Sequence, residues 1–334
     1  MPSGASSSLK IGCAAVSLLD MPTISVVVPL YNKARYIARC LDSILAQSHP
    51  HFTLYVINDG STDSSPQIAA SYSDPRLNLV NQPNAGPGSA RNHGLRFAQS
   101  DYVAFLDGDD AWHPDFLART LAHLEAHPVA ALNWGMQIFP QNITTEERWR
   151  RLHVPHGLFR LTPHSPTQQL VAILANTLPS SCVLHRQTAL HHGGFYDQDR
   201  CLFSEDAHLY LKLLLHADFY FDPAPLTLRY EDASELALNQ GGVRPIEPFL
   251  RDPEDIFHDC PAPYRPLVDR FLAARALKTA AVYGYFGHPR QARALFARFV
   301  RPTRDFSHPH FFPALLSHTP IAGFLGRLHA AVKQ

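Results

Sequence analysis

Apolar and polar positions alternate along the first third of the chain in the manner of strands and helices that follow one another. Residues 24–30 (ISVVVPL) are a continuous, largely β-branched run, which predicts a strand buried on both faces of a parallel sheet. Ile37, Leu41 and Ile44 then lie on one face of a helix. The other elements predicted here are strands at 52–57, 76–80 and 102–106, a helix starting at Ser65 and a helix at 89–98. This alternation is typical of βαβ units in a doubly wound, mostly parallel sheet.

The pattern weakens after Trp112, where proline-rich loops separate shorter apolar runs. The elements expected in this part are strands at 131–139, 181–184 and 219–221 and a helix at 207–216. Residues 266–299 predict two helices joined at 287–289, and residues 311–332 form an amphipathic segment broken by proline and glycine. We therefore expect an α/β fold with a helical C-terminal extension.

The first twenty residues lack the periodicity of a packed element, so we expect a disordered leader over residues 1–20 and a folded domain that begins at Met21. Lys10 precedes an apolar run similar to the central part of a signal peptide, but Asp20 ends that run without a clear A-x-A cleavage site. The sequence contains no stretch of about eighteen uninterrupted apolar residues, so no transmembrane helix is predicted.

Composition narrows the class of protein. The chain has 334 residues, of which 46% are hydrophobic, so it can bury a sizeable core. Lysine plus arginine and aspartate plus glutamate both number 29, and this balance argues against a nucleic-acid partner held by a broad basic field. The five cysteines are widely spaced without a C-x-x-C pair, which indicates free thiols in a reducing compartment and argues against a disulfide scaffold.

Histidine is abundant, with 20 residues, which raises the question of a zinc site. His123 and His127 are spaced i, i+4, but the glutamate between them is misplaced for an H-E-x-x-H motif. The pairs His153 with His156 and His191 with His192 resemble loop residues. Solvated surface positions are the expectation for all of these histidines.

Polar clusters follow the predicted strands, at the sheet edge where ligands bind in doubly wound folds. Asp107-x-Asp109-Asp110 places three carboxylates within four residues, and these repel one another unless a cation or hydrogen-bond donors compensate. Oxygen ligands select a hard ion such as Mg²⁺ or Mn²⁺. The alternative is an acidic turn with helix-capping aspartates. The position after an apolar strand, in register with the turn at Asp59, favours the metal site.

Two further clusters follow the second and third strands. Residues 58–63 (NDGSTD) are a common turn sequence, yet they place Asp59 at the mouth of the sheet, where its carboxylate can accept a bond from a ribose hydroxyl or a base N–H. Residues 84–94 (NAGPGSARNHG) contain glycines that permit close approach of the backbone to a ligand.

Together these segments resemble the signature of glycosyltransferase family 2 on the GT-A fold. The matching stretches are residues 26–32 (VVVPLYN), 58–63 (NDGSTD), 84–86 (NAG), 90–94 (ARNHG) and 107–110 (DGDD). A weaker match follows at 193–197 (GGFYD) and 204–209 (SEDAHL). The resemblance runs from about residue 24 to about residue 230 and does not extend to the last hundred residues.

The resemblance implies a role for each matching position. The residues that it implies for the nucleotide base and ribose are Pro29, Tyr31, Asp59 and Arg91. Asp107 resembles the first aspartate of the D-x-D motif, near the ribose and metal, and Asp109 resembles the direct metal ligand. Asp206 resembles the catalytic base, with Glu205 beside it. The sequence departs from the family at Asn58, where many members carry aspartate, and at residues 229–231 (RYE), where relatives often show an arginine and a histidine.

The resemblance also implies an activity. We expect an inverting glycosyltransferase, dependent on Mn²⁺ or Mg²⁺, that moves a sugar from a nucleotide-diphosphate sugar, foremost a UDP-sugar, to a hydroxyl of a glycan or lipid-linked acceptor in surface polysaccharide synthesis. The implied division is a nucleotide-sugar-binding half at 21–118, an acceptor-binding and catalytic half at 119–235, and a mainly helical region at 236–334. We expect a cytoplasmic protein. The C-terminal helices could contact the inner face of the plasma membrane through four basic residues, Arg301, Arg304, Arg327 and Lys333.

Two other classes of protein remain as alternatives. A sugar nucleotidyltransferase has a similar nucleotide-binding half, but it needs a glycine-rich basic loop after the first strand, and residues 31–34 (YNKA) contain no glycine. A catalytically inactive sugar-nucleotide-binding or scaffolding protein would be under no pressure to keep Asp107, Asp109, Glu205 and Asp206.

Overall fold

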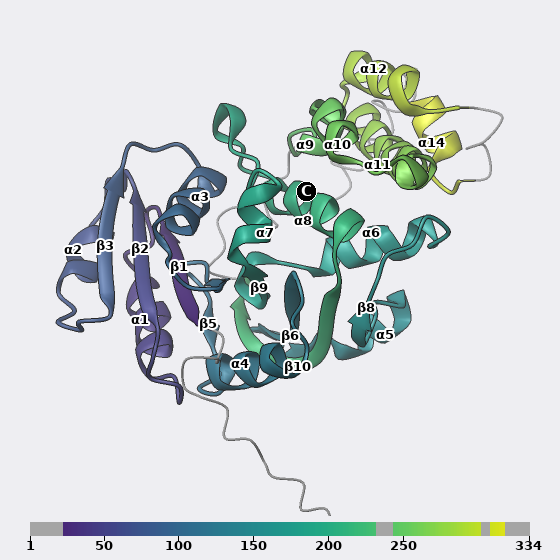
Figure 1. Ribbon diagram of the computed structural model, residues 1–334. Coiled ribbons are helices and arrows are strands. Elements are labelled where there is room, and N and C mark those ends of the chain that lie inside the picture. Colours follow the sequence, from purple (N-terminus) through teal and green to yellow (C-terminus); the bar gives the residue numbers. More distant parts are fainter. Residues whose placement is uncertain (1–22, 232–242, 302–307, 318–334) are drawn as a thin grey trace, which may run out of the picture.

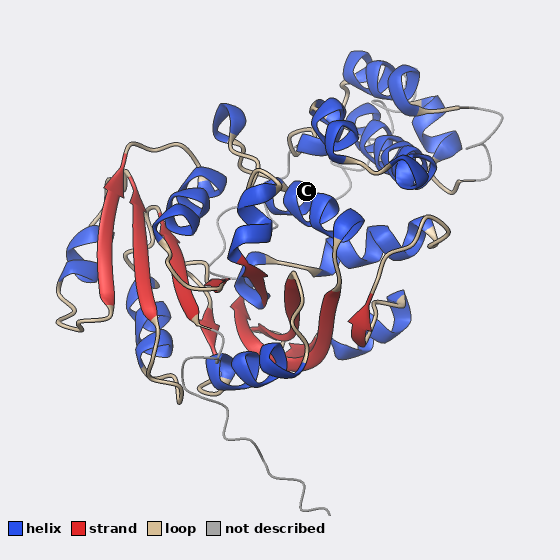
Figure 2. Cartoon of the chain, in the orientation of Figure 1, coloured by secondary structure: helices blue, strands red, loops and turns tan. Residues whose placement is uncertain are grey.

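The computed structural model describes residues 23–231, 243–301 and 308–317. The predicted leader at 1–20 and most of the amphipathic tail lie outside the described residues. One large mixed sheet runs through the molecule in the strand order β3-β2-β1-β4-β9-β6-β10-β5, with helices on both faces (Figures 1 and 2).

The N-terminal part of the sheet is wholly parallel, as the alternation predicts. Its strands are β1 (Ile24–Leu30), β2 (Thr53–Asp59), β3 (Leu77–Gln82) and β4 (Tyr102–Phe105). β1 pairs with both β2 and β4 in parallel register, and β2 pairs with β3. The carboxyl ends of these four strands therefore lie at one edge, which brings the polar clusters at 58–63, 84–94 and 107–110 to the same side of the sheet.

Both faces of β1 are buried because its side chains alternate between two cores. Val26 and Val28 pack with α1 (Ile37–Leu45), α2 (Ser65–Ala70) and α4 (Phe116–Ala126). Val27 points to the other face, which α3 (Pro87–Phe97) and α8 (Glu205–His216) cover. α3 lies close to the strand because Gly94 leaves no room for a side chain: a Cβ there would sit 2.4 Å from Val27.

The second part of the sheet mixes directions. β4 pairs antiparallel with β9 (Cys182–His185), and β9 pairs antiparallel with β6 (Ala131–Phe139). β6 then runs parallel to β10 (Phe219–Tyr230), the longest ladder of the sheet. The smaller elements are β5 (Ala111–Trp112), β7 (Ile143–Thr144), β8 (Gly157–Phe159), α5 (Glu146–Leu152), α6 (Thr167–Asn176), α7 (Arg186–His191), and the 3-10 turns η1 (Pro179–Ser181) and η2 (Gln198–Arg200).

β10 is much longer than the strand predicted at 219–221. Proline has no N–H to donate to a neighbouring strand, so Pro223 and Pro225 predict a loop after residue 221. The structure accommodates them in an irregular stretch, where the register with β6 shifts on both sides of Pro225. Gly135 on β6 makes room for this bulge, because a Cβ there would lie 2.0 Å from the carbonyl oxygen of Pro223.

The C-terminal region is helical, as expected, and lies over α6 and α8 (Figure 1). Its described elements are α9 (Pro248–Arg251), α10 (Pro253–Asp259), η4 (Ala262–Tyr264), α11 (Arg265–Tyr285), α12 (Pro289–Phe299) and α14 (Phe311–Leu316). α11 ends at the predicted joint, where Gly287 adopts a φ of +84°. Within the described ranges, none of the helices combines the length and apolar character that crossing a bilayer requires.

The histidines are less uniform than expected. His127, His153, His156 and His191 are exposed, and His123 is half-buried. The expectation is wrong for His192, which is buried at the end of α7 and bonded to Asp259 on α10. Sequence position could not show this, because α10 that covers His192 lies more than sixty residues further along the chain.

Candidate active site

The acidic turn after β4 is held in a fixed position at the sheet edge. The amide of Asp110 donates to the carbonyl of Asp107 (2.9 Å), and the amide of Asp107 donates to Oγ of Ser180 (3.1 Å). β5, which follows the turn, pairs with Thr227 and Leu228 at the far end of β10. The turn is therefore anchored to both parts of the sheet.

The carboxylates of this turn point to different partners. Nζ of Lys33 lies 2.8 Å from Oδ2 of Asp109, and the Arg39 guanidinium donates to the carbonyl of Asp109 (2.6 Å). Asp110 is buried and accepts from the amide of Tyr230 (3.2 Å). Burial, with the charges of Asp109 and Asp107 next, raises the pKa of Asp110 to about 8. Burial and the Asp107 charge also raise the pKa of Asp109, against the opposing effect of Lys33.

Arg91 on α3 joins the acidic turn to α8. Its guanidinium lies 2.7 Å from Oδ1 of Asp107 and 2.6 Å from Oε1 of Glu205. The side chains of Arg91 and Glu205 are 5% and 9% exposed, so their ion pair forms in a region of low dielectric, whereas Asp107 is 35% exposed to solvent. The structure thus brings together Arg91, Asp107 and Glu205, which the sequence placed in three separate motifs.

Asp206 lies next to Glu205 in the first turn of α8, where the helix dipole favours negative charge. Its Oδ1 accepts from the amide of Ala207 (2.8 Å). Burial first, and the charge of Glu205 second, raise the pKa of Asp206 to about 7, although Arg91 opposes this shift. Asp206 can therefore exchange a proton near neutral pH, which is the property expected of a general base.

A side-chain clamp on α3 fixes the segment that leads to α8. Asn92 donates to the carbonyl of Phe195 (2.8 Å) and accepts from the amide of the same residue (2.8 Å). It also donates to Oδ2 of Asp197 (3.1 Å). Gly194 is needed at this point because a Cβ there would lie 2.4 Å from the Asn92 side chain. The 90–94 and 193–197 motifs therefore bind one another.

Asp59 at the end of β2 organises the turn that precedes α3. Its carboxylate accepts from Gln82 (2.8 Å) and from the amides of Ala85 (2.8 Å) and Gly86 (2.9 Å). Asn58 donates to Asn81 (2.8 Å) and accepts from the amide of Ser61 (3.0 Å). Three protein donors already bind Asp59, and a carboxylate offers about four acceptor positions.

The first motif lies against the second. The amide of Asn32 donates to Oγ of Ser61 (3.2 Å), and the amide of Lys33 donates to Oγ of Ser65 (2.7 Å). Pro29 is half-buried in β1, whereas the ring of Tyr31 is exposed. Tyr31 is therefore open to solvent just beyond the end of β1, at the same sheet edge as Asp59.

The donor set fits a hard divalent cation. Asp107, Asp109 and Asp110 supply oxygen ligands, and burial, followed by the charges of neighbouring carboxylates, raises the pKa of Asp109 and Asp110. A divalent ion would stabilise the ionised form of these carboxylates. Asp107 and Asp109 are the residues positioned to hold such an ion, with Lys33 and Arg91 as their present partners.

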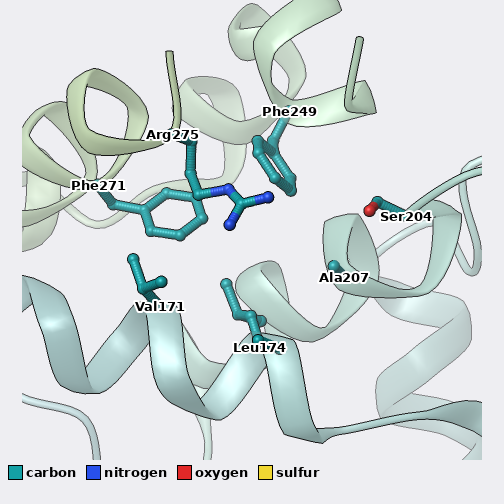
Figure 3. A pocket seen from close by; sticks show the side chains of 8 residues that line it. Val171, Leu174, Ser204, Ala207, Phe249, Phe271 and Arg275 are labelled. Carbon is teal, nitrogen blue, oxygen red and sulfur yellow. The ribbon is translucent and has the colours of Figure 1, made fainter. Parts of the chain in front are cut away.

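A cavity opens beside the N-terminus of α8 (Figure 3). Ser204 and Ala207, which flank Glu205 and Asp206, form one part of its wall. Val171 and Leu174 of α6 line the opposite part, and Phe249, Phe271 and Arg275 project from the C-terminal helices above. The cavity therefore lies between α6 and α8 and the C-terminal helices, and most of its lining residues are apolar, with Ser204 and Arg275 as the polar ones.

Sequence reasoning missed three residues around the acidic turn. Lys33 was considered only as part of a loop without glycine, and Arg39 and Tyr230 received no site role. The Arg39 guanidinium lies 3.4 Å from the centroid of the Tyr230 ring, which in turn stacks on Phe139. The departure from the family at 229–231 was a usable signal, because it marked this strand end as part of the site.

Comparison with known proteins gives the family. The model of "Glycosyl transferase family 2" matches residues 25–194, just over half of the chain. EpsJ of Bacillus subtilis, an uncharacterized glycosyltransferase, is 25% identical over 273 residues, which cover 80% of this chain and 71% of EpsJ. TuaG of the same organism, a glycosyltransferase named for teichuronic acid biosynthesis, is 36% identical over 140 residues, and the match covers 41% of this chain and 55% of TuaG.

Two solved structures show the same fold. TarS of S. aureus, residues 1–349 in complex with UDP-GlcNAc, has a TM-score of 0.55 at 20% identity, over 91% of this chain and 83% of that chain. The mannosyltransferase PcManGT of Pyrobaculum calidifontis, in complex with GDP-Man and Mn²⁺, has a TM-score of 0.53 at 19% identity, over 92% and 87%. The predicted GT-A fold is confirmed, and the chain belongs to glycosyltransferase family 2.

Proposed function

We propose that this glycosyltransferase moves a sugar from a nucleotide-diphosphate sugar, foremost a UDP-sugar, to a hydroxyl of a glycan or lipid-linked acceptor with inversion. The observation that carries the proposal is the contact of Arg91 with both Asp107 and Glu205 at the same sheet edge. Asp206 follows Glu205 and has a pKa raised to about 7. The complex of TarS with UDP-GlcNAc supports a UDP-sugar as the donor.

Asp206 acts as the general base in this proposal. Glu205 forms an ion pair with the Arg91 guanidinium at 2.6 Å, which neutralises its charge and fixes the position of its carboxylate. Asp206 is bonded to a backbone amide, has a raised pKa, and can take the proton of the acceptor hydroxyl as that oxygen attacks C1 of the donor sugar. A single displacement of this kind inverts the anomeric centre.

The nucleoside binds at the edge formed by Pro29, Tyr31, Asp59 and Arg91. Asp59 keeps one acceptor position beyond its three protein donors, which suits a base N–H. We expect Asp59→Ala to weaken uridine binding even without metal. Because that change also frees the amides of Ala85 and Gly86, the melting temperature must be measured alongside the affinity.

Asp109, with Asp107, would hold the divalent ion, Mn²⁺ or Mg²⁺. When bound, the ion supplies a Lewis acid that neutralises the leaving diphosphate. The complex of PcManGT with GDP-Man and Mn²⁺ supports this assignment. Lys33, bonded to Asp109, is placed to share the neutralisation of charge at this point.

The acceptor approaches from the side of α6 and α8, which belong to the half proposed to bind it, residues 119–235. The cavity beside Ser204 and Ala207 is lined by Val171, Leu174 and Phe271, surfaces that suit an apolar portion of an acceptor (Figure 3). Ser204 and Ala207, which line the cavity, flank Glu205 and Asp206 in the sequence, so an acceptor held there would lie at the end of α8 that carries the proposed base.

Peripheral contact with the cytoplasmic membrane face is part of the proposal. Several exposed apolar side chains lie on the C-terminal helices: Val282, Phe286, Phe312, Leu315 and Leu316. Exposed apolar groups of this kind favour contact with a lipid surface. Of the basic residues named for this contact, Arg301 is described, and Arg304, Arg327 and Lys333 lie outside the described residues. The name of TuaG, for teichuronic acid biosynthesis, supports a role in surface polysaccharide synthesis.

A screen of sugar nucleotides with Mn²⁺ tests the proposed function. We expect a UDP-sugar to raise the melting temperature and to be hydrolysed slowly without an acceptor, because water can take the acceptor's place. Binding without hydrolysis, also in the presence of candidate acceptors, would favour the catalytically inactive alternative. Stabilisation by GDP-sugars alone would overturn the assignment of the nucleotide.

A further inference from the structure

A row of polar side chains joins α8 to α10, away from the candidate active site. His208, Lys212 and His216 are spaced i, i+4, i+8 on α8, so they lie along one face of the helix. Asp255 and Asp259, spaced i, i+4 on α10, lie opposite them. Nε2 of His208 lies 2.7 Å from Asp255, and Nζ of Lys212 lies 3.0 Å from the same carboxylate.

Near the C-terminus of α8, the aspartate of this row contacts histidines and not a lysine. Nδ1 of His192, from the end of α7, lies 2.6 Å from Oδ2 of Asp259. Nε2 of His216 lies 3.4 Å from Oδ1 of Asp259 and 2.6 Å from its carbonyl oxygen. Asp255 is thus matched by a lysine, whereas Asp259 faces two imidazoles whose ring centroids are 4.5 Å apart.

We propose that His192, His216 and Asp259 form a binding site for a divalent transition-metal ion, of which Zn²⁺ is the natural probe. Their ligand atoms all lie within 4.8 Å of one another, and among the described residues they form a group of three metal-ligating side chains that no catalytic role explains. Two imidazoles and one carboxylate are a donor set that zinc accepts, with a fourth position for water.

The distances permit coordination with small movements. Zinc bonds of about 2.0–2.1 Å in a tetrahedron separate two ligand atoms by roughly 3.3 Å. The 3.4 Å between His216 and Oδ1 of Asp259 already fits, and the 2.6 Å between His192 and Oδ2 of Asp259 would have to lengthen by less than about 1 Å. Since the three ligand atoms lie within 4.8 Å of one another, no pair would have to close by more than about 2 Å. The metal would replace the hydrogen bond from His216 to the Asp259 carbonyl.

Access and position also suit a structural ion. The His192 side chain is 5% exposed, whereas those of His216 and Asp259 are 28% and 24% exposed, so one side of the group faces solvent. The three residues end α7, α8 and α10 respectively. A metal here would fasten the first helices of the C-terminal region to α8, whose opposite end carries Glu205 and Asp206.

Titration of the full chain with Zn²⁺ tests the site, after treatment with a chelator and in the Asp109→Ala background, which removes the proposed catalytic ligand. We expect a saturable site with one ion per chain, and a melting temperature that rises with Zn²⁺. Bound Co²⁺ should show the visible absorption of a tetrahedral nitrogen–oxygen site. This outcome does not depend on whether the chain transfers sugar.

Three variants separate this site from zinc binding by surface histidines. His216→Gln is the main test because His216 is partly exposed, and it should weaken zinc binding by at least about tenfold while the protein stays folded. His192→Gln should do the same if it folds. His191→Gln, at the exposed neighbouring residue, should bind as the parent does. Equal zinc affinity in His216→Gln and His191→Gln, or no saturable site in the parent, would overturn the proposal.

Discussion

Two regions of α8 shift the pKa of nearby carboxylates in opposite directions. One is the first turn of the helix, and the other is the face that contacts α10. At the first turn, Glu205 and Asp206 lie beside Asp107, and burial raises the pKa of Asp206 to about 7. On the face toward α10, hydrogen bonds from His208 and Lys212 lower the pKa of Asp255. The ionised form of Asp206 is therefore destabilised at the first turn of α8, whereas His208 and Lys212 of the same helix stabilise the ionised form of Asp255 on α10.

The comparison supports the proposal that the first turn of α8 performs the chemistry and that the contact with α10 is structural. A carboxylate with a lowered pKa stabilises the folded state above the ordinary pKa of aspartate, which suits a structural contact. A carboxylate with a raised pKa lowers the stability of the folded protein as the pH rises from about 4 to about 7, because the unfolded chain ionises first. Carboxylates with a raised pKa are common at active sites, where the group takes part in proton transfer.

The largest expected effect comes from Asp206→Asn. Removing the proposed base should lower sugar transfer by roughly 10²- to 10⁴-fold while donor affinity stays near that of the wild type. In the wild type, kcat/KM should rise with pH through about 7, as Asp206 loses its proton, and this rise should be absent from the residual activity of the variant. Steady-state kinetics across this range, with calorimetry for donor binding, checks both.

Glu205→Gln is the matched control for that experiment. It should disturb the ion pair with Arg91 and thus stability, but keep a rise of activity with pH, shifted to lower pH than in the wild type because the charge of Glu205 helps to raise the pKa of Asp206. If Asp206→Asn transfers sugar at the wild-type rate and Glu205→Gln does not, the base is Glu205. If neither change matters, the assignment of this motif is wrong.

Arg91→Met should have the next largest effect, on stability. It leaves the carboxylates of Asp107 and Glu205 without their buried cation, and loss of one partner from a buried ion pair costs about 3–5 kcal/mol. Urea unfolding measures this. Arg96→Met on the exposed face of the same helix should change stability by no more than about 0.5 kcal/mol. A similar small change for Arg91→Met would show that the network of charges contributes little.

Asp109→Ala should abolish Mn²⁺-dependent donor binding and leave the fold intact. The change removes a carboxylate whose pKa is raised by burial and by Asp107, so repulsion at the turn falls, although Lys33 loses its partner. Calorimetry with a nucleotide and Mn²⁺, and a melting curve, are the measurements. Unchanged nucleotide affinity in Mn²⁺ would contradict the role of Asp109 as a metal ligand.

The smallest expected effects are on the pH dependence of stability, and they should have opposite signs at the two ends of the comparison. Asp255→Asn should be less stable than the wild type at about pH 7, and the difference should shrink as the pH falls below about 4. Asp206→Asn should be as stable as the wild type below about pH 4 and equally or more stable at about pH 8. Denaturant unfolding at several pH values measures the free energy of unfolding of both variants. Changes of the same sign with pH in the two variants would contradict the proposed contrast.

Sequence alone determined most of the N-terminal half. The run at 24–30 matched β1, and the amphipathic stretch beginning at Ile37 matched α1, because burial on two faces or on one leaves a short-range pattern in the residues themselves. The positions of the polar clusters followed from the same reasoning, since parallel strands end at a common edge.

Only the tertiary structure decided how the charged groups are partnered. Arg91 and Glu205 are 114 residues apart, and His192 and Asp259 are 67 apart, so no local pattern links them. β10 was hidden for a related reason, because its prolines fit a strand only where Gly135 of another strand makes room. Periodicity and turn chemistry depend on neighbours in the chain, whereas ion pairs, burial and pKa shifts depend on which distant segments pack together, and that is fixed only when the chain folds.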